Sequence, residues 1–339
     1  MLRRMIVASS LALAAGCQSS AGNPFARTGA STPPSADAAL LFVSGSWSQT
    51  PGQPRELFAI NADGSKVERL TTCATASTPC DFLQVAPSPD RNRVIAIRTI
   101  PGAAAGTSTL YFMDLSRSVE TVIFQNRRVD SADYSPDGSF IIYSAPEGTQ
   151  GDTDLYYSQP NGQGEQDLTS TTTFRELDPR VDPFASTAVY EGIDLSVANG
   201  ASRVYLFSQT PLTSGPATGG PALPGTPYVV GGDASPALSP DGLYVVFRRL
   251  TDVGNGGLGS WDLMTVKTDG ASQPTALVTG PLYRSAPDWN AKGIVYVETD
   301  ASQSRSQLVL IQPDGSGRTV LHSEDSGFLM GSPRWLPGS

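Results

Sequence analysis

Few residues of this chain could support acid–base or metal chemistry. The 339 residues include a single histidine, His322, and one histidine cannot build a two-histidine zinc motif or a set of histidine ligands. The segment from Gly254 to Gly259 matches G-x-G-x-x-G, but it joins two apolar runs typical of strands. A dinucleotide site needs that motif between a strand and a helix. We therefore predict no catalytic residue and no cofactor.

Pairs of acidic residues are the remaining candidates for chemistry. Two carboxylates can hydrolyse a glycosidic bond when they flank a cleft and lie about 5–10 Å apart. The G-D-T-D-L run around Asp154 could also offer oxygen ligands to Ca²⁺, but a lone D-x-D supplies too few of them. Because Asp is favoured in turns and at strand ends, we predict no metal site and keep a carbohydrate-active enzyme as an alternative. The pairs are Asp152/Asp154, Asp178/Asp182, Asp130/Asp133 and Glu324/Asp325.

The elements that must position these residues are short strands. Apolar and aromatic runs recur after residue 38, each bounded by Gly, Pro, Asp or Asn, and no helical period is sustained. The chain is therefore predicted to be all-β. Examples of these runs are ALLFV, RVIAI, TLYFM, FIIYS, YVVFR and IVYVE.

A repeat organises the predicted strands. Each unit contains an S-P-D-G-like turn followed by an apolar strand. Pro presets φ at the first corner of such a turn, Asp bonds the backbone two residues on, and Gly takes the positive φ that closes a hairpin. Each unit is predicted to hold four strands, which can bury their faces only against neighbouring units. At intervals of 46 to 57 residues, the turn position is occupied by Pro89, Pro136, Pro183, Pro240, Ala291 and Pro337.

The S-P-D-G turn with its apolar strand, followed by a D-x-Y-like strand and a D-G turn, resembles the TolB-type, WD-like β-propeller repeat. The resemblance covers about residues 39–339 and implies a propeller, a fold that hosts many activities. The first unit begins at Ala39 without an innermost strand, and the C-terminal segment GSPRWLPGS has the sequence of only that strand. We therefore expect a six-bladed β-propeller in which the C-terminal strand closes the first blade.

Residues 1–16 resemble a bacterial lipoprotein signal peptide. Arg3 and Arg4 precede a short apolar segment that ends in Leu-Ala-Ala-Gly before Cys17. The resemblance implies that Cys17 is lipidated, and that Gln18 favours the outer membrane, with the protein facing the periplasm or the cell exterior. An ordinary secretory signal is the alternative. Residues 17–38 are rich in Ser, Ala, Gly, Thr and Pro, so we expect them to form a flexible tether.

The two other cysteines, Cys73 and Cys80, lie in one Thr- and Ser-rich stretch. In an exported protein they are predicted to form a disulfide, and two free thiols are the alternative. A zinc site is a weaker explanation, because one histidine cannot complete it.

The charge of the chain restricts its partners. A net charge of −9, an isoelectric point near 4.7 and the lack of a Lys/Arg stripe exclude nucleic acid. In a propeller, the loops that lead into the innermost strands converge on the axis. Their acids, arginines and aromatics suit an envelope protein or peptide, bound by a monomeric, non-catalytic module. A structural envelope component is a further alternative. The predicted contact residues are Phe82, Arg128, Asp130, Glu176, Asp178, Asp233, Tyr283 and Arg284.

Overall fold

The computed structural model contains strands as its only regular elements among the residues that it describes. Among the residues that the structure describes, no helix has the length and hydropathy needed to cross a bilayer. The prediction of an all-β chain is confirmed. The described residues are 30–46, 55–72, 81–99, 108–124, 127–147, 151–196, 202–208, 232–253, 258–325 and 328–339.

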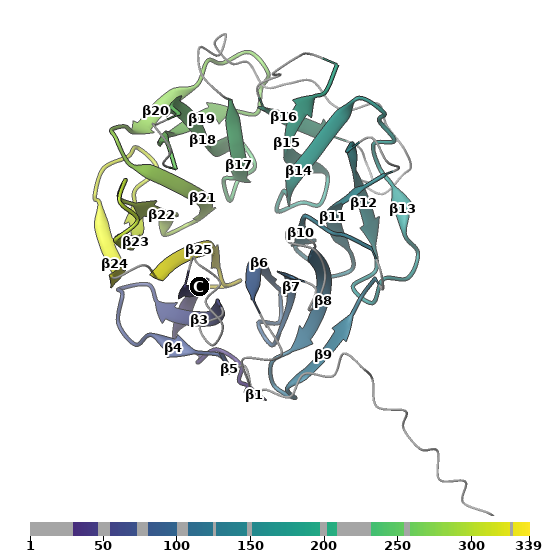
Figure 1. Cartoon of the computed structure of the whole chain (residues 1–339), viewed down its shortest axis with the longest axis horizontal. Coiled ribbons are helices and arrows are strands. Elements are labelled where there is room, and N and C mark those ends of the chain that lie inside the picture. The colour runs from purple at the N-terminus through teal and green to yellow at the C-terminus, as the bar shows by residue number, and fades with distance from the viewer. Residues whose placement is uncertain are drawn as a thin grey trace, which may run out of the picture.

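Four sheets of four antiparallel strands make up most of the molecule, and they are arranged around a central axis (Figure 1). The first is β25-β2-β3-β4, with bounds Phe328–Trp335, Ala38–Ser46, Glu56–Asn61 and Glu68–Arg69. The second is β6-β7-β8-β9, with bounds Phe82–Pro87, Arg93–Thr99, Ser108–Asp114 and Val119–Val122. The third is β17-β18-β19-β20, with bounds Asp233–Leu238, Tyr244–Asp252, Ser260–Lys267 and Thr275–Val278. The fourth is β21-β22-β23-β24, with bounds Tyr283–Asn290, Gly293–Thr299, Arg305–Ile311 and Thr319–Asp325.

A seven-stranded sheet lies between the second and third of these sheets along the chain. It consists of two antiparallel groups, joined only where Thr153 of β12 pairs in parallel with Arg175 of β14. The first group is β10 (Ser131–Tyr134), β11 (Ile141–Pro146), β12 (Thr153–Ser158) and β13 (Gln166–Asp167). The second group is β14 (Phe174–Val181), β15 (Thr187–Asp194) and β16 (Arg203–Ser208).

The core lies between the sheets rather than within one layer. Each cluster of buried side chains combines residues from neighbouring strand groups, as where Val94 of β7 packs with Leu41 of β2. Strand side chains alternate between two faces, so apolar runs such as VIAI bury both faces of a sheet at once. The strands that lie nearest the axis, called the innermost strands below, are β25, β6, β10, β14, β17 and β21, and each contacts the next.

The S-P-D-G turns form as their residue types require. In the turn from β10 to β11, the Ser135 hydroxyl donates to Asp137 Oδ1 at 2.8 Å and accepts from the Phe140 amide at 3.0 Å. Asp137 Oδ1 also accepts from the Ser139 amide at 3.0 Å, and Gly138 has a φ of +74°. Accepting these hydrogen bonds lowers the pKa of Asp137. These hydrogen bonds therefore hold the backbone in the turn that follows the innermost strand.

Strands β2 and β25, which are far apart in the sequence, belong to one sheet. Strand β25 pairs antiparallel with β2, so that Trp335 lies opposite Leu40 and Met330 lies opposite Ser44. Trp335 is buried beside Phe42, in the cluster that also contains residues of β22. The C-terminal strand thus occupies the axial position that the first unit leaves empty.

The packed structure begins before Ala39. Composition predicts a tether that extends to residue 38, yet Ala30–Ser31 form β1 and pair with Thr71–Thr72, which form β5. The Thr32 amide also donates to the Leu70 carbonyl at 2.9 Å, because an unpaired sheet edge offers backbone partners to any extended segment. The predicted signal peptide, Cys17, Cys73 and Cys80 lie outside the described residues.

Candidate functional site

Four of the predicted contact residues occupy one structural position and are buried there. Phe82, Glu176, Asp233 and Arg284 each lie six residues before the start of an S-P-D-G-like turn. None of them is more than 2% exposed, so their side chains face the interior between sheets and present no surface to a partner. The prediction that they are exposed funnel residues is therefore not supported by their burial. The two equivalent residues of the other units, Val129 and Met330, are buried as well.

The charges at this position are neutralised by the second strand of the same sheet. Asp233 lies opposite Arg249 and accepts from its Nε at 2.7 Å and its Nη2 at 2.8 Å. Arg284 lies opposite Glu298, and their side chains are 3.2 Å apart. In this pair the innermost strand carries the positive charge and the second strand carries the negative one. Buried ions are tolerated when they are paired in this way. Asp233 and Arg284 therefore stabilise their sheets. An oppositely charged residue on the next strand is the sequence feature that indicates this structural role.

Glu176 lacks such a cation, because Gly192 is its partner on β15. Its Oε2 accepts from the hydroxyl of Thr169 and from the amide of Leu155, while its buried Oε1 has no hydrogen-bond partner among the described residues. Burial raises the pKa of Glu176 to about 8. This carboxyl is therefore held mostly protonated at neutral pH.

The other four predicted residues keep some exposure. Arg128 is exposed and donates to Asp130 Oδ1 at 2.6 Å. Tyr283 accepts at its hydroxyl from Arg248 Nη1 at 2.9 Å. Asp178 Oδ2 accepts from the Ser235 hydroxyl at 3.1 Å, which links β14 to β17. Arg128 and Asp130 precede β10 and Tyr283 begins β21, so these three lie at the end of the propeller at which the innermost strands begin, whereas Asp178 lies within β14.

A backbone irregularity separates this end from the next position along four of the innermost strands. Residues four before the turn start have positive φ in four units, with values between 47° and 50°. The strand register shifts at each of them, as expected for a β-bulge that re-aims the following side chains. The four residues are Asp178, Ser235, Ala286 and Ser332.

Beyond the bulge, residues two before the turn start form an axial ring with a repeated charge pattern. Taken in the order of the strands around the axis, the pattern is Arg, Ala, Asp, Arg, Ala, Asp. Each Arg reaches past an Ala to an Asp: Arg334 forms an ion pair with Asp133, and Arg180 lies 3.5 Å from Asp288. A small side chain between the two leaves room for this contact. The axial ring consists of Arg334, Ala86, Asp133, Arg180, Ala237 and Asp288.

A cavity of about 280 Å³ opens at the S-P-D-G end of the innermost strands, opposite the predicted funnel loops. The charged members of the axial ring line it together with Trp289, Trp335 and Tyr134. Prolines of the turns, including Pro136 and Pro240, complete the wall. Two nitrogens of Arg334, Nε and Nη1, are buried here without a hydrogen-bond partner among the described residues. The cavity thus combines aromatic surface with unused donors.

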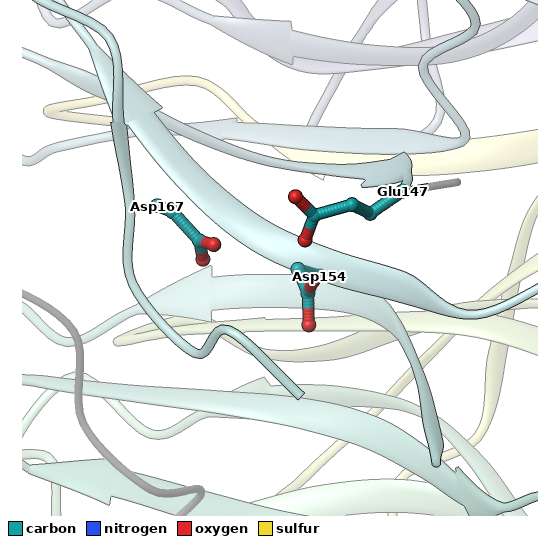
Figure 2. A group of neighbouring side chains, drawn as sticks. All are labelled: Glu147, Asp154 and Asp167. Atoms are coloured by element: carbon teal, nitrogen blue, oxygen red, sulfur yellow. The ribbon is translucent and has the colours of Figure 1, made fainter. Parts of the chain in front are cut away.

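A second group of polar residues lies away from the cavity. Glu147 follows β11, Asp154 belongs to β12 and Asp167 ends β13, and one carboxylate oxygen of each lies within 4.8 Å of the others (Figure 2). We call these three residues the acidic cluster. Burial, together with the neighbouring Glu147 carboxylate, raises the pKa of Asp154 to about 6.

Comparison with solved structures decides the fold family. TolB from Acinetobacter baumannii superposes with a TM-score of 0.66 at 18% identity, covering 90% of this chain and 68% of that one. A protein assigned as TolB from Agrobacterium tumefaciens gives 0.60 at 17% identity, covering 90% and 100%. The chain has a TolB-like β-propeller fold. A chain of the nidogen/laminin complex has a TM-score of 0.57 at 10% identity, covering 88% and 98%. No known family profile and no curated protein matches the sequence.

The TolB-like fold explains why the axial ring was missed. The members of the ring lie between the turns of the repeat and the loops before them, so neither feature indicates them. Aligning the units on the turn start places Arg334, Asp133 and their equivalents in one column, and alternation along a strand places that column on the axial face. The charge pattern in this column was therefore available from the sequence.

Proposed function

We propose that this TolB-like propeller is a non-catalytic module that binds a peptide or protein of the cell envelope. The observation that carries the proposal is the cavity at the S-P-D-G end. Trp, Tyr and Arg are the residues that dominate the energetics of protein interfaces, and Trp289, Tyr134 and Arg334 all line it. One structure with a similar fold, at 10% identity, belongs to a complex of two proteins, nidogen and laminin.

The donors of the cavity favour a ligand with oxygen acceptors. Arg334 uses Nη2 toward Asp133, and its Nε lies 3.8 Å from Asp288 Oδ2, too far for a hydrogen bond, while Nη1 has no hydrogen-bond partner among the described residues. Backbone carbonyls or a carboxylate of a bound peptide would satisfy these groups through charge-assisted hydrogen bonds. The flanking prolines and aromatics would cover apolar side chains of the same peptide.

The proposal includes the location of the protein in the cell. Lipidation of Cys17 would anchor the chain to the outer membrane, facing the periplasm or the cell exterior, and residues 18–29 would connect the anchor to β1. Replacement of Cys17 by Ala should then release the exported protein from the membrane fraction. A disulfide between Cys73 and Cys80 belongs to the same proposal and is checked by thiol alkylation before and after reduction.

We also propose that the propeller has six blades and is monomeric. The seven-stranded sheet counts as two blades, since one parallel pair joins its two groups. The pairing of β25 with β2 would then close the ring between the first blade and the last. Pairing of the two ends of the chain within one sheet is how propellers avoid a free inner edge.

The acids of the axial ring do not favour the alternative of a carbohydrate-active enzyme. Asp133 is paired with Arg334, and Asp288 lies between Arg180 and Arg334. A glycosidase needs one carboxyl group as the acid and a second as nucleophile or base. Here both carboxylates are instead engaged in ion pairs with arginine.

Affinity capture with matched variants tests the proposed function. The full-length chain is immobilised and exposed to an extract of its own envelope, and the captured partner is quantified. We expect Trp289→Ala, in the cavity, to reduce capture at least ~10-fold, as loss of an interface hot spot does. Tyr283→Ala, at the other end of the innermost strands, should leave capture unchanged. If only Tyr283→Ala reduces capture, the site lies at the loops predicted from the sequence. If both variants capture the partner equally well, neither end of the innermost strands is the site.

A further inference from the structure

The acidic cluster of Glu147, Asp154 and Asp167 is held in place by its surroundings. Asp154 Oδ1 accepts from the Thr171 amide at 2.8 Å and from the Thr171 hydroxyl at 2.9 Å. Asp167 Oδ1 accepts from the amides of Thr169 and Ser170 at 3.0 and 2.9 Å. Each of these two carboxylates is therefore oriented through one of its oxygens.

The second oxygen of Asp154 has no such partner. Asp154 is fully buried, and its Oδ2 forms no hydrogen bond with any residue that the structure describes. The carboxylates of Glu147 and Asp167 lie beside it (Figure 2). A buried carboxylate oxygen without a donor or cation destabilises the folded state. A bound cation would satisfy this buried oxygen, which belongs to a residue with two further acids beside it.

The cluster also lacks a protein counter-charge. Among the described residues, no Lys, Arg or His forms an ion pair with Glu147, Asp154 or Asp167. The Thr169 hydroxyl lies within hydrogen-bond distance of both Asp154 and Glu176. Glu176 is therefore a fourth acidic residue next to the acidic cluster. Several other buried acids of this propeller are paired with arginine, as Asp233 is with Arg249.

We propose that the acidic cluster binds a Ca²⁺ ion, which ties together the ends of β11, β12 and β13. All the donors are oxygens, the ligand type that Ca²⁺ takes, and no His or Cys belongs to the cluster as zinc would favour. Two oxygens on opposite sides of Ca²⁺ lie up to about 5 Å apart, given Ca–O distances of about 2.5 Å. Separations of at most 4.8 Å are compatible with that sphere. Water and backbone carbonyls would complete the coordination.

Calorimetric titration of the full-length chain with CaCl₂, after removal of divalent cations with EDTA, tests the site. We expect one Ca²⁺ per chain and a melting temperature that rises with Ca²⁺ concentration, because the ion binds only the folded state. Asp154→Asn should weaken Ca²⁺ binding at least ~10-fold, since it removes a direct ligand. The melting temperature of Asp154→Asn in EDTA should equal or exceed that of the wild type, because one buried negative charge is gone.

The controls separate this site from weak binding elsewhere. Asp137→Asn changes an exposed carboxylate in the same sheet and should keep the wild-type affinity for Ca²⁺. If Asp154→Asn does not fold, Glu147→Gln carries the same test, because Glu147 is exposed. The assignment is overturned by a wild type that shows neither heat nor a melting shift with Ca²⁺. It is equally overturned by unchanged affinity in the ligand variant, or by Mg²⁺ binding more tightly than Ca²⁺.

Discussion

Arg334 and Asp133 are 201 positions apart in the sequence and form a buried ion pair beside the axis. Arg334 belongs to the last strand, β25, and Asp133 to β10, while β6 lies between these two strands around the axis. The pair is possible because Ala86, the equivalent residue of β6, leaves the space between them. The same arrangement recurs with Arg180, Ala237 and Asp288.

Filling that space should break the pair. Ala86→Leu places a branched side chain where Arg334 passes, and we expect a loss of about 1–3 kcal/mol in the free energy of unfolding, typical of overpacking. Denaturant unfolding measures it. Ala271→Leu, in an exposed turn, is the control and should change the free energy by no more than about 0.5 kcal/mol. Equal stability of both variants would show that the small side chain of Ala86 is not needed for the ion pair of Arg334 and Asp133.

The pairing of β25 with β2 gives a prediction for Trp335. Its side chain is 6% exposed and packs with Phe42, so Trp335→Ala should cost about 3–5 kcal/mol. Leu243→Ala, which changes a side chain that is 59% exposed, should cost little. Thermal unfolding of the two variants is the measurement. A Trp335→Ala protein that melts like the wild type would be incompatible with a C-terminal strand built into the first sheet.

The buried pair of Asp233 and Arg249 predicts non-additive substitutions. Asp233→Ala removes the carboxylate that Arg249 contacts with two nitrogens and should destabilise the protein by about 3 kcal/mol. Adding Arg249→Met should restore much of the loss, because an apolar pair fits the same interior position. A double-mutant cycle by denaturant unfolding checks this. Additive losses would mean that the two residues act independently.

These residues show what the sequence could and could not predict. The S-P-D-G turns gave the repeat and the all-β fold, because Ser135, Asp137 and Gly138 act through local chemistry that a turn carries with it. The role of Asp233 could not be read in the same way, since its partner Arg249 lies on the next strand at a position set by the register. The bulge at Ser235 was equally hidden, because a positive φ at a residue other than Gly leaves no sequence signal.

Glu191 makes stability depend on pH. Burial, followed by the nearby Asp178 carboxylate, raises the pKa of Glu191 from 4.5 to about 7. The folded state therefore holds this proton more tightly than the unfolded state, so its contribution to stability is present below pH 4.5 and is lost as the pH rises to about 7. Glu191→Gln should remove that part of the pH dependence. Unfolding curves of both proteins between pH 4.5 and 8 should diverge as the pH rises, and parallel curves would contradict the assignment.

Hydrogen–deuterium exchange with and without the captured partner tests the central claim most directly, because it locates the bound surface on the folded chain. The cavity at the S-P-D-G end predicts slower exchange in residues 133–137, 180–184, 237–241, 288–291 and 334–337 when the partner is bound. Residues 127–130, 174–178 and 283–285, at the other end of the innermost strands, should exchange as in the free protein. Protection confined to this second set, with the cavity residues unchanged, would contradict the account.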